Sequence, residues 1–263
     1  MAPKEYAPDP RLASLVKCYW TTQRHFLPPA NTFQILPDRY IEVIFCYGAP
    51  AYVVTPASCL PLPSLYLVHL LEHPLTLRFD GLITIVAARL YGWALDLLVT
   101  QPTTSTALPI TSLEETFSQL SAQLTTYLQN NQPQQAVQCL ETILLERFQR
   151  QLPLQQRQAQ LLNHLLNQAQ LPCPAALAEQ FALSVRQVER LVKTASGITP
   201  KLLTRLVRFE QARDRLWQQP RSNLTALAYE IGYADQAHFS RDFKVFSGQS
   251  PRAFMRQVRQ WQA

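Results

Sequence analysis

The chain has 263 residues, and its 24 Lys and Arg residues against 18 Asp and Glu residues give a net charge of +6. That length allows one large domain or two of ordinary size, and a hydrophobic content of 47% excludes a wholly disordered chain. Residues 1–154 carry 9 basic and 11 acidic residues, whereas residues 155–263 carry 15 and 7. The excess positive charge therefore lies towards the C-terminal end, which indicates a polyanionic partner for that end or a solubilising charged surface.

Cysteine usage and hydropathy indicate a cytoplasmic protein. The five cysteines form no C-x-x-C pair, so we expect free thiols in a reducing compartment rather than a zinc or redox site. The N-terminus carries charged residues where a signal peptide needs an apolar run. The longest apolar stretch, residues 82–99, contains Arg89 and Asp96, which disfavours a membrane span.

Residues 1–110 are predicted to form a β-rich domain. They contain 13 of the 20 prolines and several short runs of β-branched and aromatic residues bounded by Pro, Gly or Asp. Strands are expected at residues 40–47, 51–55, 64–71, 75–79 and 82–87. Residues 89–99 fit a strand or a helix. Short strands with frequent turns favour a small sandwich or barrel.

Residues 111–154 are predicted to form a pair of antiparallel helices. From Thr111 onward apolar residues recur every three or four positions, and a turn at residues 130–133 separates two such stripes. The first stripe is Leu113, Phe117, Leu120, Leu124 and Tyr127, and the second is Val137, Leu140, Leu144 and Phe148. One stripe is expected to pack on the β-rich domain. The other either joins a core or forms a homodimer.

Residues 155–263 are predicted to be helical throughout, because Pro and Gly occur there only at the edges of periodic segments. Helices are expected near residues 155–169, 175–182, 184–195, 200–217, 224–231, 235–246 and 251–260. This domain contains an internal repeat, in which residues 177–208 resemble residues 227–259. The matching pairs are Leu177 and Leu227, Ser184 and Asp235, Val188 and Phe239, Arg190 and Arg241, Lys193 and Lys244, Gly197 and Gly248, and Pro200 and Pro251.

Each copy predicts a short helix, a tight turn and a second helix. Ser184 and Asp235 are suitable N-caps for that second helix, and Gly197 and Gly248 are suitable C-caps. Gly232 suits a turn position with positive φ, where the first copy has Ala182. A second helix with an outer face of Arg, Gln and His is typical of a helix-turn-helix.

A single helix over residues 200–217 joins the two copies and spans roughly 27 Å. Two recognition helices on such a spacer can enter the major groove about one turn, ~34 Å, apart.

The second copy resembles the signature of AraC/XylS-type transcriptional regulators. Residues 232–244 read GYADQAHFSRDFK, and Gly248, Ser250, Pro251 and Phe254 follow, against a family pattern of G-Y-x-D-x-x-x-F-S-R-x-F-K and then G-x-S-P-x-x-F. The resemblance covers residues 160–260, about 40% of the chain. It implies a double helix-turn-helix domain that binds double-stranded DNA. Two departures are Glu189, which would repel phosphate, and the Ala182-Leu183 turn.

A short segment of the N-terminal half resembles a second family. Leu36-Pro37-Asp38-Arg39 before residues 41–45 resembles the L-P-D-G-x-x-E-L-I-F segment of an uncharacterised β-rich domain that often precedes AraC-type regions. Arg39 stands where that pattern has glycine.

The recognition helices supply the candidate DNA contacts. Base contacts are expected from Arg186, Gln187 and Arg190 in the first motif and from Gln236, His238 and Arg241 in the second, since Gln pairs with adenine and Arg with guanine. Phosphate contacts are expected from Lys193, Lys201, Arg205 and Lys244, with a solvated surface as the alternative for each.

The β-rich domain is expected to sense a small molecule. Its aromatic residues line either an apolar pocket or the core, and they are Tyr19, Trp20, Phe33, Tyr40, Phe45, Tyr47, Tyr66 and Trp93. His69 and His73 are interpreted as ordinary buried or surface residues, and neither a catalytic motif, a metal site nor a cofactor is predicted.

Taken together, the sequence predicts an α+β protein. It has a β-rich barrel or sandwich at residues 1–110, a helical linker or dimerisation pair at 111–154 and an AraC-type DNA-binding domain at 155–263. We expect a transcriptional regulator rather than an enzyme, with DNA and a small-molecule effector as partners. A homodimer through residues 111–154 and, for an activator, RNA polymerase are further expected partners. The alternatives are a ligand-binding or enzymatic β-domain with a degenerate DNA-binding appendage, and a constitutive DNA-binding module whose β-domain only dimerises.

Overall fold

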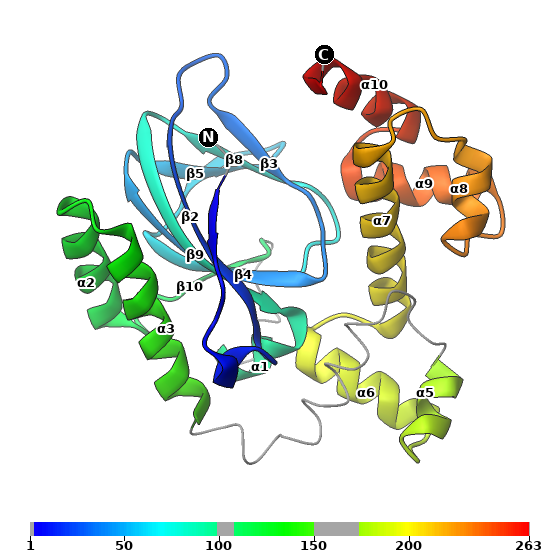
Figure 1. The fold of residues 1–263 in the computed structure, drawn as a ribbon, viewed down its shortest axis with the longest axis horizontal. Helices are drawn as coiled ribbons and strands as arrows, with labels where there is room; N and C mark the ends of the chain where they lie inside the picture. Colours follow the sequence, from blue (N-terminus) through cyan, green and yellow to red (C-terminus); the bar gives the residue numbers. More distant parts are fainter. Residues whose placement is uncertain (1–2, 99–107, 150–173, 263) are drawn as a thin grey trace.

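The computed structural model of the chain describes residues 3–98, 108–149 and 174–262. Two antiparallel sheets form the N-terminal region (Figure 1). The six-stranded sheet has the order β1-β2-β9-β4-β7-β10, and the four-stranded sheet has the order β3-β8-β5-β6. The first sheet contains β1 (Lys4–Tyr6), β2 (Val16–His25), β4 (Tyr40–Gly48), β7 (Leu65–Val68), β9 (Leu82–Tyr91) and β10 (Ile110–Ser112). The second contains β3 (Thr32–Ile35), β5 (Ala51–Val54), β6 (Cys59–Pro61) and β8 (Leu75–Phe79).

Side-chain alternation gives the six-stranded sheet two different faces. On β4, Ile41, Val43 and Phe45 are buried in the core that includes the helices, whereas Ile44 is buried in the separate core that includes the second sheet. Glu42 has the same parity as Ile44 and pairs across the sheet with Arg89 of β9. A polar pair thus lies on the face that is otherwise apolar and turned towards the second sheet.

Several strands differ from the sequence prediction. The structure has β1, β2, β3 and β6, none of which was predicted, and it extends the predicted strand 82–87 to Tyr91. The predicted strand 64–71 is shorter, at Leu65–Val68. Residues 92–98 form a 3-10 turn, η2 (Gly92–Ala94), and a short helix, α1 (Leu95–Leu98); another 3-10 turn, η1 (Pro10–Leu12), precedes β2.

The helical pair is α2 (Ser118–Gln129) and α3 (Pro133–Gln149). The prediction of a helix from Thr111 was wrong, because residues 110–112 pair with β7 as an edge strand. Both predicted stripes face the same core: Leu120, Leu124, Leu140 and Leu144 are all nearly inaccessible to solvent. Neither stripe is therefore free to form an apolar dimer contact.

The C-terminal helices follow the predicted positions to within two residues. They are α5 (Pro174–Gln180), α6 (Val185–Ser196), α7 (Pro200–Gln218), α8 (Leu224–Glu230), α9 (Gln236–Ser247) and α10 (Pro251–Gln262). The helix expected at residues 155–169 lies outside the described residues. No helix in the described parts of the chain is long and apolar enough to cross a membrane.

The two copies of the repeat have the same backbone pattern at their caps. Ser184 accepts a hydrogen bond from the backbone N–H of Gln187, and Asp235 accepts one from that of His238. Gly197 and Gly248 end α6 and α9 in the left-handed conformation, with φ of 76° and 74°. These local signals explain why the sequence located the helix ends well.

The turns within the two copies differ in the residue that adopts a left-handed backbone conformation. Gly232 has φ +86°, and Ala182 occupies the corresponding place with φ +52°. Left-handed backbone is unfavourable for a residue with a Cβ. The first motif therefore keeps the turn at a cost that the second motif avoids.

Aromatic side chains and one ion pair join α9 to α7. The ring of Phe209 on α7 lies 5.2 Å from that of Phe243 and 5.3 Å from that of Phe246. Beside this cluster, both carboxylate oxygens of Asp242 accept from the guanidinium of Arg205, at 3.0 and 2.9 Å. The Asp242 side chain is only 7% exposed, so this pair is part of the packing of the second motif.

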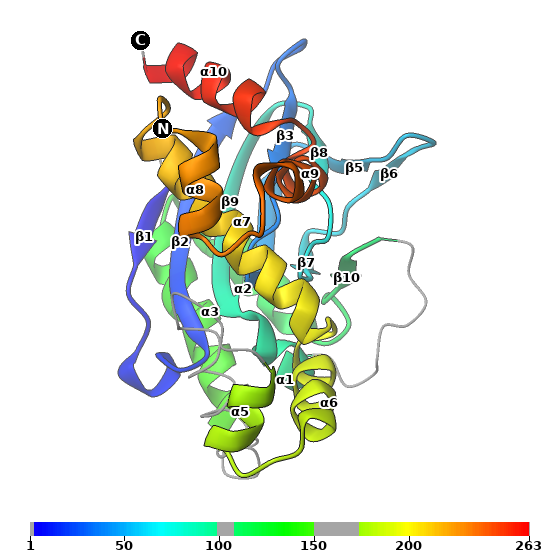
Figure 2. The ribbon, with the colours of Figure 1, turned by 90° about the vertical axis from the view of Figure 1, so that its right-hand side faces the viewer.

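The β-rich region meets the helical region at α7 and α6 (Figures 1 and 2). Glu210 of α7 accepts from Arg39 twice, from its backbone N–H at 2.8 Å and from its guanidinium Nε at 2.5 Å. The carbonyl of Arg39 accepts from the N–H of Gly92 at the start of η2. In turn, η2 and α1 pack against α6. One short segment before β4 therefore contacts α7 directly and is connected to α6 through η2.

The strained turn leads to a stability prediction. Ala182→Gly should raise the free energy of unfolding by about 1 kcal/mol, because glycine adopts positive φ without a Cβ penalty. Urea unfolding of the full chain measures this change.

Two matched variants serve as controls. Ala226→Gly, at an exposed position of α8, should lower stability by about 1 kcal/mol, as glycine does inside a helix. Gly232→Ala should also lower stability, since Gly232 has φ +86°, which is unfavourable for a residue with a Cβ. A loss of stability in Ala182→Gly equal to that in Ala226→Gly would contradict the strain argument.

Candidate nucleic-acid interface

The outer face of α6 presents all three of its predicted base contacts to solvent. Arg186 and Arg190 are exposed, and so is Glu189 between them. Gln187 is exposed as well, but its side-chain oxygen accepts from the N–H of Ser184 at 2.7 Å and completes a capping box. In the free protein Gln187 therefore stabilises the start of α6. The face that packs inward contains Val188 and Val192.

The outer face of α9 is more constrained. Arg241 is exposed, and its Nε donates to the carbonyl of Ala237 at 3.3 Å. The side-chain oxygen of Gln236 accepts from the hydroxyl of Thr225 at 2.7 Å. His238 is 45% exposed and lies edge-on against the ring of Tyr233, 5.1 Å between centroids. Successive helical residues are about 100° apart, so His238 and Arg241 lie near each other on α9, whereas Gln236, at its first position, faces Thr225 of α8.

The four predicted phosphate contacts divide into two kinds. Lys193, Lys201 and Lys244 are exposed, and the first and third lie in the last turns of α6 and α9. Arg205 is different because its guanidinium binds Asp242 through two hydrogen bonds and lies 5.2 Å from the ring centre of Phe246. Sequence reasoning missed Asp242, whose position one residue after Arg241 places it on the buried face of α9.

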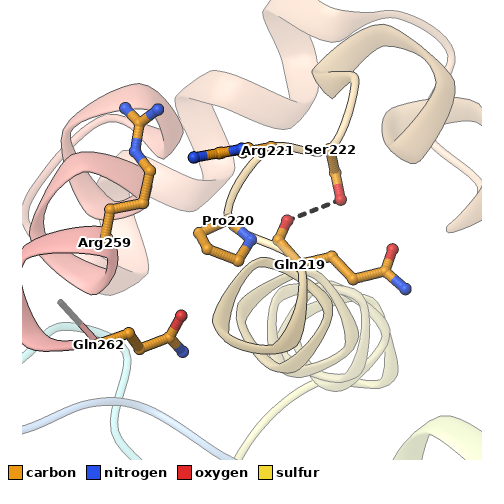
Figure 3. Close-up of a pocket in the computed structure, with 6 residues that line it drawn as sticks. All are labelled: Gln219, Pro220, Arg221, Ser222, Arg259 and Gln262. Carbon is orange, nitrogen blue, oxygen red and sulfur yellow. Dashed lines mark hydrogen bonds between the residues drawn. The ribbon is translucent and has the colours of Figure 1, made fainter.

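A wide polar hollow lies between the end of α7 and α10 (Figure 3). Its volume is about 660 Å³, and it is lined by Gln219, Pro220, Arg221, Ser222, Arg259 and Gln262. Arg221, on the turn after α7, and Arg259, on α10, were not selected by the sequence analysis; both are labelled in Figure 3. The turn below is closed by a hydrogen bond from the Ser222 hydroxyl to the carbonyl of Gln219.

A second cavity, of about 430 Å³, lies in the β-rich region between the two sheets. Of the predicted aromatic pocket residues, Trp20, Phe33 and Tyr66 line it. The others belong to the core on the opposite face of the six-stranded sheet, buried or packed against it: Tyr19, Tyr40, Phe45, Tyr47 and Trp93. Alternation along the strands explains the division, which the sequence alone did not assign.

Charged groups also line the second cavity. Arg89 binds Asp38 (Nη2 to Oδ2, 2.6 Å) and Glu42 (Nε to Oε1, 3.1 Å). Burial raises the pKa of Glu42 to about 7 and raises the pKa of Asp38, because desolvation outweighs the attraction of Arg89. Arg213 of α7 lines the cavity too, so its wall includes the helix that joins the two motifs.

His69 and His73 have different surroundings. Nε2 of His69 is 2.8 Å from the hydroxyl of Thr111, and His73 is exposed. Among the described residues, no group of three or more His, Cys, Asp or Glu side chains is arranged to hold a metal ion.

Comparisons with known proteins match the two regions separately. Residues 177–257 match the family described as a helix-turn-helix domain, and residues 4–107 match a domain of unknown function (DUF6597). Over 82 residues the chain is 36% identical to the HTH-type transcriptional activator RhaS of Pectobacterium atrosepticum. Over 83 residues it is 43% identical to RhaS of Yersinia pestis. These matches cover 31% of this chain in both cases, and only 29% and 30% of the relatives.

Among solved structures, ToxT of Vibrio cholerae O395 is similar with a TM-score of 0.46 at 9% identity, over 91% of this chain and 98% of that one. The family match and the RhaS relatives agree with the duplicated motif and its caps. The chain therefore carries an AraC/XylS-type helix-turn-helix domain at its C-terminal end, preceded by an N-terminal β-rich domain of the DUF6597 type.

Proposed function

We propose that this chain is a sequence-specific DNA-binding transcriptional regulator whose two helix-turn-helix motifs read adjacent segments of the major groove. The observation that carries the proposal is the pair of capped second helices, α6 and α9, each with exposed cationic side chains, on either side of α7. At 19 residues, α7 is about 28 Å long. That length is close to the ~34 Å between successive major-groove segments on one face of DNA.

The proposal assigns two kinds of contact. Base edges are read by Arg186, Gln187, Arg190, Gln236, His238 and Arg241. Gln187 and Gln236 would exchange their present partners, Ser184 and Thr225, for a base. Phosphates are bound by Lys193, Lys201 and Lys244, which position the protein without reading sequence. Arg205 is assigned to the packing of α9 because its guanidinium is already bound to Asp242.

The remaining partners follow from the same regulatory role. The β-rich domain binds a small-molecule effector, and the chain acts at the chromosome in the bacterial cytoplasm. The curated relatives RhaS are activators; an activator of this kind also contacts RNA polymerase. A homodimer through residues 111–154 would have to use the outer faces of α2 and α3, since both apolar stripes are buried.

The reading helices supply the main test. Arg190→Ala and Arg241→Ala should each weaken binding to duplexes selected from genomic DNA by the wild-type chain by about 10-fold, since a good base contact contributes about 1–3 kcal/mol. Lys244→Ala should weaken binding to all duplexes similarly and lower the slope of log K against log salt by about one. Titrations with labelled duplex at several salt concentrations measure both effects.

Lys17→Ala is the control, because it removes one positive charge from an exposed position on β2. Wild-type affinity in both arginine variants would reject the assigned contacts. Absence of duplex binding by the wild-type chain at low salt would reject the regulator itself and favour a ligand-binding or enzymatic β-domain.

Arg205 provides a separate prediction about folding. Arg205→Met should lower the free energy of unfolding by about 1–3 kcal/mol, because it leaves the carboxylate of Asp242 buried without its two donors. Urea unfolding measures the loss. Lys244→Met is the matched control, since it removes an exposed charge and should leave stability unchanged. A fully stable Arg205→Met variant with weakened DNA binding would instead make Arg205 a phosphate contact.

A further inference from the structure

The cavity between the two sheets has an apolar, aromatic lining. Trp20 comes from β2, Phe26 from the residue after it and Phe33 from β3, and Tyr66 and Phe79 come from β7 and β8. At about 430 Å³ the cavity is within the range that holds small organic ligands. Phe33 is 46% exposed, which is unusual for a large aromatic residue and leaves one wall open to solvent.

Two buried carboxylates line this cavity, and the positive charges around them are unequally shared. Asp38 and Glu42 are 12% and 14% exposed and share a single guanidinium, that of Arg89. The other charged lining residues are Glu5, Arg24 and Arg213. The guanidinium of Arg24 lies 4.7 Å from the ring centre of Phe26, and that of Arg213 binds Asp214 at 3.0 Å and also attracts Asp38. Glu42 is attracted by Arg89 and has a side-chain hydrogen bond with Trp20.

A second cation would complete the pairing of Glu42. Burying a carboxylate is unfavourable unless it is paired, and the raised pKa of Glu42 is consistent with an incompletely paired site. Aromatic faces attract a cation and also accommodate an apolar body. An anion placed beside Glu42 would approach two buried carboxylates, which disfavours it.

We propose that this cavity binds a small amphipathic cation, an aromatic or alkyl amine, with its charged nitrogen at Glu42 and its apolar body among Trp20, Phe26 and Phe79. The cation shares the pairing of Glu42 with Arg89, and the apolar body displaces water from the space between the sheets. The proposal deepens the effector role given above to the β-rich domain and rests on that proposed function for its effect on DNA binding.

The cavity also adjoins the contact between the β-rich and helical regions. Asp38 lines it, and the next residue, Arg39, is bound to Glu210 of α7. Arg213, which also lines the cavity, lies one turn further along the same helix. A ligand that changes the pairing of Asp38 and Arg89 therefore acts directly beside the helix that sets the positions of both recognition helices.

A charge series on one apolar body tests the ligand class. Calorimetry on the full wild-type chain compares 4-phenylbutylamine, 4-phenylbutanol and 4-phenylbutyrate, which differ only in the polar end. We expect the amine to bind at least about 10-fold more tightly than the alcohol, and the carboxylate to bind most weakly. Equal affinities for the amine and the alcohol, or tighter binding of the carboxylate, would overturn the proposal. This measurement needs no variant.

A variant then locates the cation. Glu42→Gln should lower the affinity for the amine about 10-fold and leave the alcohol unaffected, whereas Glu115→Gln, an exposed control, should change neither. An unchanged amine affinity in a folded Glu42→Gln variant would reject Glu42 as its partner.

The regulatory part is tested by repeating the duplex titration with saturating amine. The amine should shift duplex affinity in the wild-type chain and not in Glu42→Gln. Amine binding without any duplex binding would reject the proposed function and keep the cation site. Duplex binding without amine binding would reject the cation site and keep the proposed function.

Discussion

The buried ion pair between Arg39 and Glu210 fixes how the two regions of this chain meet. The carboxylate of Glu210 is 6% exposed and receives two hydrogen bonds from one residue, one from the backbone and one from the side chain. A buried carboxylate tolerates few alternative arrangements, because losing a donor leaves charge in an apolar environment. Since Glu210 lies in the middle of α7, the pair orients the helix to which both motifs are attached.

The two motifs differ in what supports them. The second has its own aromatic core, in which Phe239, Phe243 and Phe246 pack with Phe209 and Phe254. The first has smaller buried residues, Val188 and Val192, and it packs against η2 and α1 of the β-rich region. The position of α6 therefore depends on the N-terminal half of the chain more than the position of α9 does. A conformational change in that half would therefore move α6 more directly than α9.

Local features of the chain were predictable, and contacts between distant residues were not. The caps Ser184, Gly197 and Gly248 act within a few residues of where they stand, so the helix ends could be placed from sequence. Strand β10 was mistaken for a helix because residues 110–112 owe their conformation to β7, more than 40 residues earlier. The pairs Arg39–Glu210 and Arg205–Asp242 span 171 and 37 residues, and no local pattern connects their members.

Arg39 stands where the resembling segment of other β-rich domains has glycine. A glycine can offer its backbone N–H to Glu210 but has no guanidinium to accompany it, so half of the contact would be absent. A chain with glycine here and the same glutamate on α7 would hold its two regions together through the backbone hydrogen bond alone. A substitution at position 39 alone can thus change how strongly the two regions bind each other, without altering α6, α9 or the lining of the cavity.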